Sequence, residues 1–382
     1  MRSNYLVFGS PRIEEDEIQE VVETLKSGWI GSGPKVQEFQ RDFSKYINVK
    51  HSVAVSSCTA GLHLSLIALG IGKGDEVIVP AMTFAATANS VVHTGATPVF
   101  ADVDKFKMTI DIEDVKRKIT GKTKAIIPVH FAGRACNIDE LENLAKEYKL
   151  KIIHDTAHAI ETEYKGKKVG SYGDISSYSF YVTKNVVTGE GGMVTTNDDQ
   201  LAEKIKIYAL HGMSKDAWKR FSDDGYKHYQ VIYPGYKYNM TDIQASLGIH
   251  QLKKVEQYWL RRQSIWNRYK KELKHLPLFL PPDAEANTKH AYHLFTVMLD
   301  IDNTSISRDE LLTALHKMNI GTGVHYLALN LQPYYQSAFG YKKGDFPNSE
   351  FISERTLSLP FSAKLSDQDV TDVIDSLKKI LL

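Results

Sequence analysis

Short apolar runs alternate with helix-like stretches from about residue 50 to residue 210, and this alternation constrains the fold more than any other feature of the chain. The runs are rich in Val and Ile, are bounded by Gly, Pro or Asp, and lie at residues 51–57, 75–81, 97–103, 124–133 and 151–155. Such runs are typical of buried parallel strands. The stretches with helical character lie at residues 59–70, 84–95 and 137–150. We therefore expect an α/β fold with helices on a mostly parallel sheet.

A long helical pattern from Met240 to Leu276 follows this region, and the pair Pro281 and Pro282 after it cannot continue a helix. The remaining segments predict a small α+β unit. A chain of 382 residues is long enough for one large domain and a smaller companion. We expect a large domain with the N-terminal segment at residues 1–255 and a small C-terminal domain at residues 256–382.

The composition excludes several classes of protein. The 47 basic residues are balanced by 46 acidic ones, so no nucleic-acid partner is indicated. The N-terminus lacks the apolar stretch of a signal peptide, and no run of 18 apolar residues predicts a membrane span. The two cysteines, Cys58 and Cys136, predict neither a disulfide framework nor a metal cluster. We expect a cytoplasmic protein with no membrane partner.

One lysine, Lys184, lies among hydroxylated residues and glycines in FYVTKNVVTGEGG, residues 180–192. Most lysines are solvated surface residues. The alternative is a nucleophilic amine that forms a Schiff base with a carbonyl cofactor. The run DISSYSFYVTK predicts a strand that ends at Lys184, and Ser179 lies five residues before the lysine. The other polar groups at the same sheet edge decide between the two interpretations.

Ligands of open α/β sheets bind at the carboxyl ends of the strands, and two further segments deliver polar groups there. In VSSCTAGLHL a strand leads into a helix whose start carries Ser57 and Thr59, which fits an anion site and ordinary N-capping equally well. In KIIHDTAHAIETEY, Asp155 directly follows a buried strand, where a carboxylate requires a partner such as a protonated pyridine nitrogen. Asp155 and His158 would otherwise be metal ligands, but no third ligand lies at a recognised spacing.

A helix-start anion site, Asp155 and Lys184 are together what a phosphorylated pyridine aldehyde requires. The phosphate would bind at the helix start, with the Ser179 hydroxyl within reach, and the aldehyde would bind Lys184. Phe84 in PAMTFAATANS would either stack on the flat ring or belong to the core. The glycine fingerprint of a nicotinamide dehydrogenase is absent from the sequence.

Several motifs carry a closer resemblance, namely SGWIGSGPKVQEF, PAMTFAATANSV, HDTAHAIETEYKGKKVGSYGD, SFYVTKNVVTGEGGMVTT, GYKYNMTDIQASLGIHQL and IGTGVHY. With them the chain resembles, over essentially its whole length, the DegT/DnrJ/EryC1/StrS family of nucleotide-sugar aminotransferases. These enzymes depend on pyridoxal 5'-phosphate (PLP) and have aminotransferase fold type I, with a mostly parallel mixed sheet and a smaller C-terminal domain. The segments PVHFAG, HGMSKDAW and PGYKYNM are similar to enzymes of the UDP-4-amino-4-deoxy-L-arabinose type.

The resemblance implies roles at the matching positions. Lys184 would bind PLP and act as acid and base, Asp155 would pair with the ring nitrogen, and His158 would contact the side of the ring's phenolic oxygen. The remaining roles are phosphate binding by Thr59, Ala60 and Ser179, stacking by Phe84, substrate contact by His325 and Tyr326, and phosphate binding in the neighbouring subunit by Asn239. The resemblance therefore implies a homodimer with shared active sites.

The implied reaction transfers an amino group from glutamate, which becomes 2-oxoglutarate, to C4 of a nucleotide-linked keto-sugar for cell-surface glycans or lipopolysaccharide. Tyr181 stands where relatives acting at C4 often have His, whereas Glu190 favours C4, so a C3 aminotransferase stays an alternative. His154 also replaces an acidic residue common in the family. A sugar dehydratase would have His in place of Lys184, and a non-catalytic regulatory protein would have lost Lys184 or Asp155.

The segment KRFSDDGYKHYQVIY, residues 219–233, is charged and aromatic without a clear period. It predicts either a solvated loop or a flap in which Lys219 and Arg220 would contact a diphosphate of the substrate.

Overall fold

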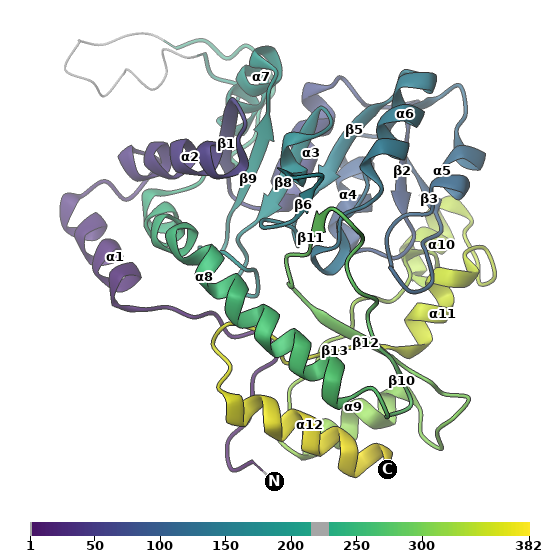
Figure 1. Cartoon of the computed structure of the whole chain (residues 1–382). Coiled ribbons are helices and arrows are strands. Elements are labelled where there is room, and N and C mark those ends of the chain that lie inside the picture. Colours follow the sequence, from purple (N-terminus) through teal and green to yellow (C-terminus); the bar gives the residue numbers. More distant parts are fainter. Residues whose placement is uncertain (1, 215–228) are drawn as a thin grey trace.

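The computed structural model describes residues 2–214 and 229–382, and a seven-stranded sheet lies at its centre with helices packed against it (Figure 1). Across the sheet the strands follow the order β1 (His51–Val55), β9 (Gly192–Thr196), β8 (Ile175–Ser179), β5 (Lys151–Asp155), β4 (Thr123–Ile126), β2 (Glu76–Pro80) and β3 (Thr97–Ala101). Neighbours from β8 to β3 are parallel, whereas β9 is antiparallel to β1 and to β8. The predicted α/β fold with a mostly parallel mixed sheet is confirmed.

Helices bury both faces of this sheet. The helices of this part of the chain are α1 (Glu15–Ser27), α2 (Pro34–Ile47), α3 (Cys58–Ala68), α4 (Ala85–His93), α5 (Ile112–Lys118), α6 (Ile138–Tyr148) and α7 (Asp199–Ala209). In β2, Val77 and Val79 belong to one apolar cluster with Leu62 of α3, whereas Ile78 belongs to another with Leu141 of α6. Since both faces are covered, successive residues of the strand are apolar, which explains the continuous apolar runs in the sequence.

Helix α8 (Asp242–Glu272) runs from the large sheet to the C-terminal part of the chain (Figure 1). It begins with a capping box in which Thr241 and Gln244 exchange hydrogen bonds. Its first half packs beside the large sheet through Ile249 and Val255, and its second half packs in the C-terminal core through Trp266. The helix continues through residue 255, so the domain boundary near that residue stays a prediction.

The C-terminal part contains a three-stranded antiparallel sheet and several helices. Its strands are β10 (Leu278–Phe279), β12 (Phe295–Leu299) and β13 (Thr356–Leu359), and its helices are α9 (Arg308–Lys317), α10 (Pro333–Phe339), α11 (Pro347–Arg355) and α12 (Asp367–Leu381). A third small sheet joins β6 (Glu163–Tyr164), β7 (Lys167–Lys168) and β11 (Thr288–Lys289). The N-terminal segment lies beside this part, because Leu6 pairs with Ile320 in a parallel bridge.

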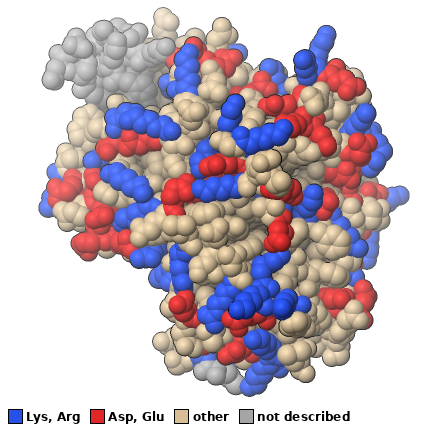
Figure 2. Space-filling view, in the orientation of Figure 1, with Lys and Arg blue, Asp and Glu red and all other residues tan. Residues whose placement is uncertain are grey.

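The surface carries mixed charge on the face that Figure 2 shows, where Lys and Arg side chains are interspersed with Asp and Glu. Among the described helices, none combines the length and the apolar character that crossing a membrane would require.

Candidate active site

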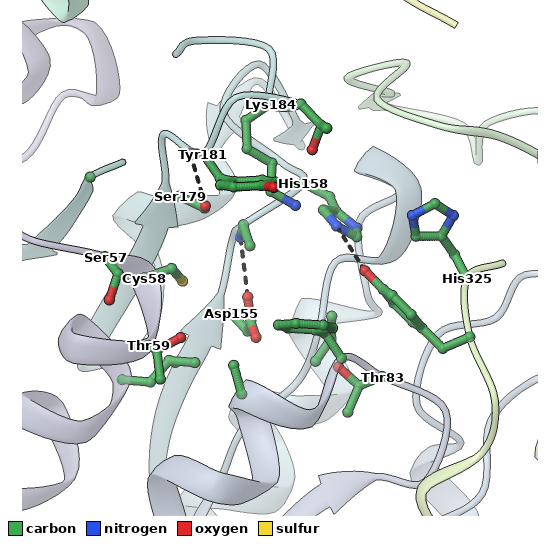
Figure 3. Close-up of a pocket in the computed structure, with 18 of the residues that line it drawn as sticks. Ser57, Cys58, Thr59, Thr83, Asp155, His158, Ser179, Tyr181, Lys184 and His325 are labelled. Carbon is green, nitrogen blue, oxygen red and sulfur yellow. Dashed lines mark hydrogen bonds between the residues drawn. The ribbon is translucent and has the colours of Figure 1, made fainter. Parts of the chain in front are cut away.

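A cavity of about 320 Å³ opens at the carboxyl ends of β5 and β8, beside the first turns of α3 and α4 (Figure 3). This is the sheet edge at which the sequence predicts a ligand. The sequence-predicted residues that line the cavity are Thr59, Phe84, Asp155, His158, Ser179, Lys184, His325 and Tyr326. The structure thus brings together side chains from five separate segments of the chain.

Asp155 ends β5 and is buried at the cavity wall. One carboxylate oxygen accepts a hydrogen bond from the Thr87 hydroxyl at 2.9 Å, and the other accepts one from the Ala157 N–H at 3.1 Å. Burial raises the pKa of this carboxyl above its ordinary value, against the effect of these hydrogen bonds and of the Lys184 charge. No ion pair within residues 2–214 and 229–382 includes Asp155, so this carboxylate suits a cationic ligand.

Lys184 lies in a turn, and the prediction that a strand extends to it is wrong. Strand β8 ends at Ser179, where its antiparallel ladder with β9 ends at Gly192, and the chain between them forms the connection. The backbone N–H of Lys184 donates to the Tyr181 carbonyl at 2.8 Å. The half-buried side chain lines the cavity, and desolvation lowers the pKa of its amine from 10.5 to about 8. Lys184 is therefore not a fully solvated surface lysine.

His158 is held as a neutral ring. Its Nδ1 accepts a hydrogen bond from the Ala132 N–H at 3.2 Å, so the neutral ring carries its proton on Nε2, which lies 3.3 Å from the Tyr326 hydroxyl. Burial holds the pKa of His158 well below its ordinary value, and the nearby Lys184 charge acts in the same direction. The Nδ1 lone pair accepts from the Ala132 N–H and Nε2 carries the proton, so the neutral ring offers no free lone pair to a metal. His158 therefore acts as a hydrogen-bond donor toward the cavity side.

The start of α3 shows the predicted N-cap, and the predicted anion site there stays a prediction. The Ser57 hydroxyl accepts a hydrogen bond from the Ala60 N–H at 3.1 Å, so Ser57 is an N-cap. Ala60 is buried and is not among the residues that line the cavity, and its N–H is engaged in this cap. The Thr59 and Ser179 side chains lie at the cavity on adjacent segments, as Figure 3 shows.

Phe84 resolves an alternative that the sequence leaves open. Its side chain is 61% exposed at the N-cap of α4, so it is not a core residue. The ring lines the cavity with its centroid 5.8 Å from that of Tyr326. One face of the ring is therefore available to a flat ligand.

The other predicted residues lie elsewhere. Asn239 is outside this cavity, and its side-chain amide donates to the Ser32 hydroxyl at 2.7 Å. Lys219 and Arg220 lie outside the described residues.

Several residues that lie at or next to the site were not predicted from the sequence. Cys58 and Thr83 line the cavity, and Thr87 holds Asp155. Thr83 and Thr87 are spaced by one helical turn, which was the available signal for that pair. Nothing in the sequence marks His293, whose ring centroid lies 4.4 Å from that of His158.

A buried carboxylate and a lysine of lowered pKa, facing one cavity at the carboxyl edge of an α/β sheet, define an enzyme of the class that binds a pyridine aldehyde cofactor. The model of the DegT/DnrJ/EryC1/StrS aminotransferase family matches residues 11–378, and the chain belongs to this family. The chain is thus a PLP-dependent aminotransferase, and the predicted family, enzyme class and cofactor are confirmed.

Similar proteins span the whole chain. The uncharacterized protein MJ1066 of Methanocaldococcus jannaschii is 52% identical over 381 residues, covering 100% of this chain and 99% of its own length. The spore coat polysaccharide biosynthesis protein SpsC of Bacillus subtilis is 48% identical over 381 residues, covering 100% of this chain and 98% of its own. Among solved structures, the PLP form of Spr1654 from Streptococcus pneumoniae has a TM-score of 0.90 at 34% identity, covering 99% of this chain and 100% of its own. Spr1654 has also been solved in a pyridoxamine phosphate (PMP) form.

Proposed function

We propose that this aminotransferase transfers the amino group of glutamate to C4 of a nucleotide-linked keto-sugar, in the biosynthesis of an amino sugar for cell-surface glycans or lipopolysaccharide. The observation that carries the proposal is that Lys184 and Asp155 line the same cavity, in a chain 48% identical to a polysaccharide biosynthesis protein. Glu190, which lines the cavity, favours C4 over C3 on the resemblance given above.

The residues of the cavity fit PLP. Asp155 has two hydrogen-bond donors and no ion pair among the described residues, which is the environment that a protonated ring nitrogen would complete. When bound, the cofactor supplies an electron sink and carries the amino group between the two substrates. The Thr59 and Ser179 hydroxyls would hold the phosphate, and the exposed face of Phe84 would cover the ring.

Lys184 would carry the proton in both half-reactions. An amine with a pKa of about 8 is partly neutral near pH 7, so it is able to take a proton from the α-carbon of the amino donor. With the cofactor bound, the Nε2–H of neutral His158 would exchange its contact with the Tyr326 hydroxyl for a hydrogen bond to the phenolic oxygen of the ring. His325, held by a 2.9 Å contact between its Nδ1 and the Ser358 hydroxyl, would face the sugar together with Tyr326.

The proposed assembly is a homodimer that shares its active sites. Apolar side chains of α1 and the segment after it are exposed in the single chain, among them Ile18 at 49%, Leu25 at 52% and Trp29 at 56%. A second copy would cover this apolar surface. Asn239 would then serve the phosphate of the partner site, which agrees with its position outside the cavity of its own chain. The free and buried Cys58 and Cys136 fit the reducing cytoplasm that we expect for this enzyme.

The discriminating experiment presents the PMP form of the enzyme with a panel of nucleotide keto-sugars and follows the return of the PLP absorbance. A 4-keto sugar should restore the absorbance fastest, and NMR of the product should place the amine on C4. An amine on C3 would instead support the alternative that Tyr181 suggests. Absence of any reaction with all keto-sugars, in an enzyme that still reacts with glutamate, would refute the proposed acceptor.

A further inference from the structure

Asn185, the residue after Lys184, is held by three hydrogen bonds. Its amide nitrogen donates to Glu161 Oε2 at 2.8 Å and to the Ala291 carbonyl at 3.1 Å. Its amide oxygen lies 3.0 Å from Nδ1 of His293. Because an amide oxygen only accepts, Nδ1 of His293 carries the proton, and the orientation of the Asn185 amide is fixed by its partners.

Glu161 forms a buried ion pair with Arg262 of α8, and both side chains are almost completely excluded from solvent. Burial raises the pKa of Glu161 and lowers that of Arg262, while the attraction between them opposes both changes. A buried pair of this kind is tolerated only where further hydrogen bonds complete it. Arg262 binds one carboxylate oxygen and Asn185 binds the other, so Asn185 completes the pair.

The same network reaches the cavity on its other side. The rings of His293 and His158 lie with centroids 4.4 Å apart and planes inclined by 33°. Burial holds the pKa of His293 well below its ordinary value, and the Lys184 charge contributes to this. The neutral His293, fixed by Asn185, therefore forms one wall against which His158 packs.

None of Asn185, Glu161, Arg262 or His293 lines the cavity, so whatever they contribute passes through their neighbours. We propose that Asn185 is a positioning residue, which uses the Glu161–Arg262 ion pair as an anchor to fix the backbone of Lys184 and the ring of His158. This inference rests on the proposed role of Lys184. It assigns the buried ion pair of α8 a function in catalysis rather than in stability alone.

The test compares Asn185→Leu with a matched control, Asn330→Leu. Asn330 is buried, more deeply than the half-buried Asn185, and its amide likewise donates to a glutamate, Glu350 at 2.7 Å, and to a backbone carbonyl, Lys342 at 3.1 Å, away from the cavity. Both variants lose the amide hydrogen bonds to a glutamate and to a backbone carbonyl, so both should have a lower unfolding temperature, and Asn185→Leu alone also loses the contact with His293. Only the change at Asn185 should alter the environment of Lys184.

The first readout uses the protein without cofactor. The rate at which an acylating reagent modifies the Lys184 peptide, followed by mass spectrometry against pH, reports the titration of the amine. Asn185→Leu should move the midpoint upward by at least half a pH unit, because a loosened turn admits water to the amine. Asn330→Leu should leave the midpoint unchanged. With cofactor, Asn185→Leu should lower kcat at least tenfold and change KM for the sugar by less than twofold.

Asn185→Asp provides a second variant should the leucine variant fail to fold. A proton shared between the introduced carboxyl and that of Glu161 would replace one amide hydrogen bond, and an oxygen would still face His293. The Lys184 midpoint and kcat of Asn185→Asp should therefore lie between those of the wild type and those of the leucine variant. If only Asn185→Asp folds, its midpoint should be moderately higher, and its kcat moderately lower, than in the wild type. An unchanged Lys184 midpoint and kcat, with only a lowered unfolding temperature, would overturn the inference. Borohydride labelling of a lysine other than Lys184 in the wild type would instead refute the proposed role of Lys184 itself.

Discussion

Replacing Lys184 by methionine should stabilise the protein in the absence of cofactor. The amine has a pKa of about 8 in the folded chain against its ordinary 10.5, so the folded state disfavours its charge. At about 1.4 kcal/mol for each pH unit, this difference corresponds to a penalty of about 3 kcal/mol. Because Lys184 is only half-buried and Asp155 would lose a nearby cation, we expect a net gain of about 1–3 kcal/mol for Lys184→Met at pH 7.

The pH dependence of this gain has a defined sign. Below pH 8 the amine is charged in both the folded and the unfolded chain, so the full penalty is present. Between pH 8 and 10.5 the unfolded chain binds more protons at this site than the folded chain, and the stability of the wild type rises toward that of the variant. Above 10.5 the difference caused by the charge disappears.

Urea unfolding of the cofactor-free wild type and Lys184→Met at pH 7, 8.5 and 10 measures the effect. The exposed lysine Lys167, changed to methionine, serves as the control and should give the same stability as the wild type within about 0.5 kcal/mol. A Lys184→Met variant less stable than the wild type at pH 7, or a difference that does not narrow toward pH 10, would refute the reasoning that desolvation governs this lysine.

Three further outcomes are expected. Borohydride reduction of the enzyme with PLP should fix the cofactor on the Lys184 peptide, as mass spectrometry would show, and Lys184→Ala should turn over very slowly; a label elsewhere would contradict the assignment. Asp155→Asn should lower kcat about a hundredfold at saturating PLP, which is about 2.7 kcal/mol of transition-state stabilisation, because the ring nitrogen loses its counter-charge; an unchanged kcat in steady-state assays would reject this electronic role. Mixing inactive Lys184→Ala and Asn239→Ala subunits should restore part of the activity, whereas no recovery despite proven subunit exchange would exclude shared sites.

The sequence was sufficient for the fold because the central strands are buried on both faces. Strand β2 is apolar along its length for that reason, and its limits at Glu76–Pro80 fall within the predicted run. The end of β8 could not be predicted in the same way. The residues from Phe180 to Lys184 have strand-like composition, but β9 ends its ladder with β8 at the pair Ser179 and Gly192, and a partner strand is not visible in local sequence.

The site shows the same division. Asp155 was found because it stands at the end of a buried strand, and Lys184 because of the glycines and hydroxyls around it. The contacts of Asn185 could not be predicted from the sequence. They depend on the ion pair of Glu161 with Arg262, which joins residues 101 positions apart and is set by the path of α8 through the fold. Whether Phe84 lies in the core or at the cavity is likewise decided by tertiary packing.

Helix α8 also governs how the chain should unfold. Its 31 residues span about 46 Å and supply apolar side chains to two hydrophobic cores, through Leu252 at one end and Tyr269 at the other. If one core unfolds, the half of α8 that packed in it exposes its apolar side chains to water, even where the other core keeps the helix intact. The two cores should therefore lose structure in one cooperative transition, and fragments separated at residue 255 should each be left with an unburied half of α8 and fail to fold alone.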